Sequence, residues 1–151
     1  MFSFSQILCR RPCCKACIRG DGNFPALHGT VSFIKAFSGT LVVTELYNLP
    51  SPHGVYAMHI HSGAECTGTD SDPFKNAGSH LNPDNQTHPF HMGDLPAVFS
   101  NNGFSWSAVY TDRFFPEQVT GHTVIIHLQS DDYRTQPSGN SGEKIACGEI
   151  R

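Results

Sequence analysis

The chain contains little charge and no long apolar run. Asp, Glu, Lys and Arg make up 15% of its 151 residues. No stretch approaches the roughly 18 apolar residues that a membrane-spanning helix needs, so we expect no membrane partner. The formal net charge of −3 provides no overall basic field, so we expect no nucleic-acid partner. The first residues lack the charged and apolar regions of a secretory signal, which makes a cytoplasmic location the default expectation.

The sequence also lacks a convincing apolar period of 3.6 residues, and residues 114–120 predict one helical turn at most. The 14 glycines and 10 prolines favour turns over helices. Apolar and polar residues instead alternate with period two, which predicts one all-β domain of antiparallel strands with two long functional loops, residues 63–96 and 130–143. The predicted strands lie within residues 26–35, 38–47, 54–62, 103–110, 122–129 and 144–150, of which the first two form a hairpin.

Nine histidines are present, and several occupy short segments. His59 and His61 are two residues apart in a predicted strand, so both side chains project from the same face. Taken alone, such a pair is compatible with two exposed histidines. His127 ends an apolar strand, where a histidine is usually a core residue, and His80 alone would be an ordinary loop residue.

His88, His91 and Asp94 follow one another at spacings of three within a short loop. Three imidazole nitrogens and one carboxylate oxygen suit a tetrahedral metal site if His80 joins them. Histidine is the commonest metal ligand in proteins. The histidines together therefore predict a metal centre.

Two of the six cysteines, Cys66 and Cys147, are isolated and far apart. They are compatible with a long-range disulfide, which would stabilise the fold by roughly 4 kcal/mol, or with two buried free thiols. The other four lie near the N-terminus, at Cys9, Cys13, Cys14 and Cys17. The first 20 residues of the chain carry four basic side chains and no acidic one. We expect residues 1–17 to form a mobile, basic extension and residues 18–151 to form the domain. The extension is either a copper-acquisition or metal-storage arm, because thiolates select Cu(I) or Zn(II), or an incidental tail whose cysteines have no assigned role.

The order of these motifs resembles the copper/zinc superoxide dismutase family. It runs His-x-His, Gly-x-His-x-Asn-Pro, His-x2-His-x2-Asp, Val-Ile-Ile-His, Asp-Asp and Gly-Asn-Ser-Gly-Glu-Lys-Ile-Ala-Cys-Gly-Glu-Ile between about residues 29 and 150. The short loop between His88 and His91, and the position of Cys66, resemble bacterial members. The resemblance implies a Greek-key β-sandwich, or flattened barrel, of about eight antiparallel strands.

The resemblance also implies a role for each matching residue. His80 would bridge the two metals, Asp131 would accept hydrogen bonds from one histidine of each site, and Cys66 and Cys147 would form a disulfide, which hints at an oxidising compartment. The implied copper ligands are His59, His61, His80 and His127, and the implied zinc ligands are His80, His88, His91 and Asp94.

The implied activity is dismutation of superoxide to oxygen and hydrogen peroxide by one-electron cycling of copper, with His80 releasing copper and taking up a proton. Zinc cannot replace copper in this role because it has no accessible redox state. One alternative is a non-catalytic copper-binding or delivery module on the same fold. Another is a structural zinc protein, which would leave His59, His61 and His127 unexplained. The implied partners are superoxide and a copper donor, and the assembly is a monomer or a homodimer.

The sequence departs from the family pattern at Lys144, where the family carries an arginine at the mouth of the substrate channel. Lysine keeps the positive charge but lacks the planar guanidinium that binds an anion through two bonds. We therefore assign Lys144 with His80 to catalysis and expect a slower, less salt-sensitive enzyme than the best family members. His28, His53 and His122 match no ligand motif.

Overall fold

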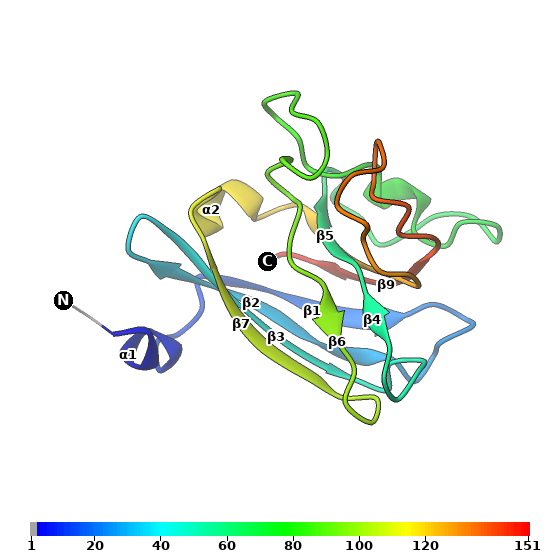
Figure 1. Ribbon diagram of the computed structural model, residues 1–151, viewed down its shortest axis with the longest axis horizontal. Helices are drawn as coiled ribbons and strands as arrows, with labels where there is room; N and C mark the ends of the chain where they lie inside the picture. Colours follow the sequence, from blue (N-terminus) through cyan, green and yellow to red (C-terminus); the bar gives the residue numbers. More distant parts are fainter. Residues whose placement is uncertain (1–2) are drawn as a thin grey trace.

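The computed structural model describes residues 3–151, which are folded mainly into β-strands (Figure 1). Among these residues, one antiparallel sheet has the strand order β5-β8-β9-β1-β2-β3-β7, and β4 pairs with β6. The prediction of an all-β, antiparallel fold is confirmed. The elements are α1 (Phe4–Leu8), β1 (Cys14–Gly20), β2 (His28–Ala36), β3 (Gly39–Tyr47), β4 (Val55–Tyr56), β5 (Met58–His61), the 3-10 helix η1 (Lys75–Ala77), β6 (Val98–Phe99), β7 (Ser105–Thr111), α2 (Pro116–Val119), β8 (Thr123–His127) and β9 (Lys144–Glu149).

The predicted hairpin is formed by β2 and β3, whose register runs from Ala36 opposite Gly39 to His28 opposite Tyr47. Phe37 adopts a positive φ of 48° in the connecting turn. The long register is stable because alternate residues of both strands, such as Phe33 and Val42, pack into one cluster of buried apolar side chains. This cluster, which also contains Ile60, Val124 and Ile126, is the main core. The hairpin therefore contributes two long paired strands to the sheet, with one face packed into the core.

Strands β5 and β8 are buried on both faces, as are the central residues of β9. One face contributes residues such as Ile60, Val124 and Ile126 to the main core. The other face is covered by the two long loops, residues 63–96 and 130–143, which Figure 1 shows in green and orange on the same side of the molecule. Side chains on the outer face of β5 and β8 are therefore enclosed between the sheet and these loops.

The cysteine-rich segment contributes to the sheet. Cys14, Ala16 and Ile18 alternate inward along β1, which pairs with β2 and β9. The expected boundary after residue 17 therefore falls inside a strand, because the alternation that builds the sheet begins at Cys14. Ile7 of α1 packs with Ile34, Ala36 and Leu41. The mobility expected of the extension stays a prediction.

The cysteines of this segment differ in exposure. Cys9, Cys13 and Cys17 are exposed free thiols, whereas Cys14 is buried. Burial raises the pKa of the Cys14 thiol. None of the helices in the described part of the chain has the length and apolar character needed to cross a membrane.

Candidate metal centre

Strand alternation separates the histidines of β5 from its core residues. Met58 and Ile60 point into the main core, so His59 and His61 point to the opposite face, under the loops. His127 ends β8, the neighbouring strand, and its amide donates to the carbonyl of Ala57 at 2.9 Å. The Nε2 atoms of His61 and His127 are consequently only 3.3 Å apart.

The loop of residues 63–96 is attached to β5 through main-chain bonds at Ile60, between the two histidines. The Ile60 amide donates to the Gly93 carbonyl at 2.9 Å, and the Ile60 carbonyl accepts from the Leu81 amide at 2.8 Å. Leu81 follows His80 and Gly93 precedes Asp94, so these bonds set both residues beside β5. Isolated bridges accordingly pair His61 with His80 and His59 with Asp94.

The candidate ligands form two groups of four that share one residue, His80. Within each group, one possible ligand atom per residue lies within 4.8 Å of all the others, and every member is buried. Among residues 3–151 no group of this kind includes an N-terminal cysteine. The first group is His59, His61, His80 and His127, and the second is His80, His88, His91 and Asp94.

Hydrogen bonds fix which imidazole nitrogens of the first group carry lone pairs. The Nδ1–H groups of His61 and His127 donate to the carbonyls of Gly78 at 2.8 Å and Gly142 at 3.2 Å. Their Nε2 atoms are therefore unprotonated and face each other. Two lone pairs in this arrangement favour a shared cation.

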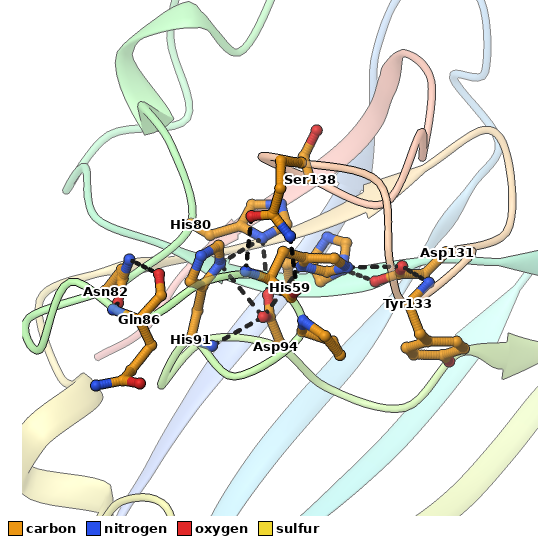
Figure 2. A network of polar contacts seen from close by, with 12 residues as sticks. His59, His80, Asn82, Gln86, His91, Asp94, Asp131, Tyr133 and Ser138 are labelled. Carbon is orange, nitrogen blue, oxygen red and sulfur yellow. Dashed lines mark hydrogen bonds and ion pairs between the residues drawn. The ribbon is translucent and has the colours of Figure 1, made fainter.

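Asp131 orients one histidine of each group. Its carboxylate accepts from Nε2 of His59 at 2.7 Å and from Nε2 of His88 at 2.8 Å. Nδ1 of His59 and Nε2 of His80 have no hydrogen-bond partner among the described residues. Nδ1 of His88 makes no hydrogen bond either, but it lies 3.1 Å from Oδ2 of Asp94, within the second group. Figure 2 shows Asp94 directed toward His80 and His91, with Asp131 on the other side of His59.

These unpartnered nitrogens test whether the residues fit metal ions. Buried polar atoms rarely lack a partner, and neutral imidazole nitrogen is a metal ligand. The first group offers four nitrogens, which suit copper, and the second offers three nitrogens and one carboxylate oxygen, which suit zinc. Both groups fit.

Burial keeps the imidazoles of the first group neutral. Burial lowers the pKa of His59, lowers that of His61 well below its usual value, and with nearby histidines lowers the pKa of His127 to about 3. Burial alone would raise the pKa of Asp131, but the hydrogen bonds from His59, the Tyr133 amide and His88 lower it to about 2. The histidines are therefore ready to bind a cation at neutral pH without first losing a proton.

These shifts predict how the stability of the metal-free chain depends on pH. A histidine with a lower pKa in the folded state binds fewer protons than in the unfolded state, so its contribution is lost as pH falls below 6.5 toward about 3. Asp131 has the same sign, and its contribution is lost from 3.8 toward about 2. We expect the free energy of unfolding, measured by denaturant titration, to fall throughout this acid range. His127→Gln should flatten the decline above pH 3, and a flat profile in the parent chain would contradict the pKa assignments.

Cys66 and Cys147 form a disulfide with a Cα–Cα distance of 5.7 Å. It joins the loop of residues 63–96 to β9. Phe74, Ala77 and Ile125 pack with Cys147 around it. The disulfide thereby anchors the loop that carries His80 to the sheet.

Lys144 begins β9 and lines the same hollow as His61, His80 and His127, which has a volume of about 350 Å³. Its ammonium group donates to Oδ2 of Asp72 at 2.8 Å and to the carbonyl of Phe74 at 3.2 Å. Sequence reasoning missed Asp72, which lies 72 residues away and belongs to no motif.

Gly139 lies against Asp131, and its φ is +69°. A Cβ atom there would lie 1.9 Å from Oδ1 of Asp131 and 2.7 Å from Nε2 of His88. Any side chain would therefore displace the carboxylate that orients both groups. Glycine in a loop gives no sequence signal for such a contact.

Residues 27–150 match the model of the family described as copper/zinc superoxide dismutase. The chain is 31% identical over 140 residues to superoxide dismutase [Cu-Zn] 1 of Aquifex aeolicus, covering 82% of this chain and 79% of that protein. It is 35% identical over 139 residues to superoxide dismutase [Cu-Zn] of Deinococcus radiodurans, covering 80% and 75%.

The fold is similar to the solved Cu/Zn superoxide dismutase of Brucella abortus, with a TM-score of 0.78 and 25% identity. That match covers 91% of this chain and 98% of the other. A mutant of a superoxide dismutase-like protein from Bacillus subtilis gives a TM-score of 0.76 at 26% identity, with 89% and 95% coverage. The chain therefore belongs to the copper/zinc superoxide dismutase family.

Proposed function

We propose that this chain dismutates superoxide to oxygen and hydrogen peroxide, with copper held by His59, His61, His80 and His127, and zinc by His80, His88, His91 and Asp94. The observation that carries the proposal is the shared residue. His80 directs its unpartnered Nε2 toward the first group, while its Nδ1 lies 2.8 Å from Oδ1 of Asp94 in the second. One imidazole thus belongs to both groups.

Copper, when bound, supplies a one-electron acceptor and donor. The chain orients the imidazole ligands. His61 and His127 donate to main-chain carbonyls, and His59 donates to Asp131. His80 supplies a site for a proton, because its Nε2 has no other partner and the residue lines the hollow through which substrate enters. Asp94 holds the opposite side of the ring, which keeps Nε2 directed toward the first group.

Lys144 attracts the substrate anion into this hollow. Its side chain is 17% exposed, and Asp72 neutralises part of its charge. A positive charge inside a cleft raises the association rate of an anion, and the gain falls as salt screens it. The contact with Asp72 therefore supports a slower and less salt-sensitive enzyme than one with an unpaired cation at this position.

Asp72→Asn is expected to raise the second-order rate constant for superoxide by up to about ten-fold, the lower end of the range for electrostatic steering, and to steepen its fall with salt. Lys144→Gln should lower the rate and remove most of the salt dependence. Pulse radiolysis over a range of ionic strength measures both. Asp70→Asn is the matched control, because Asp70 lines the adjacent hollow without an ion pair to Lys144 among the described residues. A steep salt dependence in the parent chain would contradict the proposed pairing.

Metal content measured together with superoxide turnover tests the function. We expect the chain to bind about one copper and one zinc after loading, because it has one group of ligands for each metal. Turnover should be lost in His127→Ala, which removes a nitrogen from the first group alone. Tight metal binding without turnover would instead indicate a copper carrier. The complete set of four nitrogens and the retained cation favour catalysis.

We further propose that a protein donor supplies the copper. We also propose that the chain is either a monomer or a homodimer. Sedimentation equilibrium of the metal-loaded chain distinguishes the two assemblies. Copper transfer from a donor would be measured by the appearance of turnover in the zinc-loaded chain. If no donor protein transfers copper to the zinc-loaded chain, the proposal of a protein copper donor is wrong.

A further inference from the structure

The short loop of residues 88–94 carries three ligands of the second group but has no strand or helix of its own. Its main chain is held from outside by Arg113, in the segment between β7 and α2. Nη1 of Arg113 donates to the carbonyls of Pro89 at 3.1 Å, His91 at 3.1 Å and Asp94 at 3.2 Å. One guanidinium therefore connects three points along a seven-residue loop.

A second side chain holds the other end of this loop. Gln136, in the loop of residues 130–143, accepts from the His88 amide at 2.9 Å through Oε1 and donates to the His88 carbonyl at 2.7 Å through Nε2. Two bonds to the same residue fix the rotation of its peptide groups. The start of His88-Pro89 is thus fixed relative to the loop that also carries Asp131.

We propose that Arg113 and Gln136 are positioning residues for zinc, acting through the main chain of His88, His91 and Asp94. This inference rests on the proposed assignment of zinc to the second group. The recorded bonds of both side chains to this loop are made with main-chain atoms, so their contribution is geometric. Bonds from a charged donor such as Arg113 are about twice as strong as neutral ones.

The proposal predicts an asymmetric effect on the two metals. Three members of the first group, His59, His61 and His127, come from β5 and β8, where pairing between β5 and β8 and between β8 and β9 fixes the main chain. Within residues 88–94 only Gly93 and Asp94 are joined to β5, by the bond from Ile60 and the bridge to His59, so the main chain of His88 and His91 lacks such pairing. Loss of Arg113 or Gln136 should therefore weaken zinc binding and leave copper binding unchanged.

The test uses the full chain without metals, with Co²⁺ as an optical probe of the second group and Zn²⁺ competed against a chromophoric chelator. Arg113→Ala and Gln136→Met should each lower zinc affinity by roughly 10–100-fold, the range for partners that orient ligands, and should alter the visible Co²⁺ spectrum. Arg113→Lys should recover part of the affinity, because an ammonium group still donates to carbonyls. Arg134→Ala is the control, because no recorded side-chain bond joins Arg134 to residues 88–94 in the described chain.

Unchanged zinc affinity and an unchanged Co²⁺ spectrum in both variants would overturn the proposal. A parallel loss of zinc and copper affinity would also overturn it, because that result indicates general destabilisation. These readouts do not require turnover. A chain that shows the asymmetric loss but never consumes superoxide would support this inference while refuting the proposed activity.

Discussion

Replacement of His80 by alanine is expected to lower superoxide turnover by more than about 100-fold, because loss of even a residue that only orients a metal ligand costs roughly 10–100-fold. His80 belongs to both groups of ligands. The variant should therefore bind copper weakly and zinc with lower affinity, and the chain should lose the nitrogen that can hold a proton beside the substrate. Metal analysis after gel filtration and a superoxide assay measure both effects.

His122→Ala is the matched control for His80→Ala. The His122 imidazole donates to the Ser62 carbonyl at 2.9 Å, and the residue belongs to neither group. Its replacement should leave both metals and turnover unchanged. Full metal content and full activity in His80→Ala would refute the shared role of this residue.

Removal of the disulfide is expected to have the largest effect on stability. Cys66 and Cys147 are separated by 81 residues. The chain-entropy model gives about 4 to 5 kcal/mol for a loop of this length, so Cys147→Ser should lower the free energy of unfolding of the metal-free chain by about that amount. Urea titration followed by tryptophan fluorescence measures the loss.

Cys66→Ser separates the disulfide from the packing of Cys147, because it breaks the same bond but leaves the buried Cys147 thiol in place. Both variants should lose similar stability if the bond dominates. Cys17→Ser, at an exposed free thiol, should change stability by less than about 0.5 kcal/mol. An unchanged urea midpoint in both disulfide variants would contradict the prediction.

Local sequence predicts most strands because each needs only its own alternation. The alternation predicts strands within residues 38–47 and 144–150, and β3 and β9 occupy Gly39–Tyr47 and Lys144–Glu149. The predicted boundary after residue 17 divides β1, although Cys14, Ala16 and Ile18 alternate inward. The cluster of thiols and cations obscured that period.

The candidate ligands could be selected from the sequence because their motifs are local and their order resembles a family. The side chains that hold those motifs could not. Asp72, Arg113 and Gln136 each reach their partner across a long stretch of chain, to an ammonium group or to main-chain atoms. Such contacts depend on how loops pack, and no spacing predicts them.

The main-chain bonds of Ile60 have a consequence for how the ligands are brought together. They fasten the segments around His80 and Asp94 to β5 through backbone amides and carbonyls, which every residue type except proline supplies. Among substitutions only proline at position 60 or 81 would remove one of these donors, and the bonds themselves do not require a metal. Much of the conformational entropy of ordering the ligands is therefore lost during folding, before a metal arrives. The main-chain framework that places His80 and Asp94 beside β5 is therefore built by folding itself.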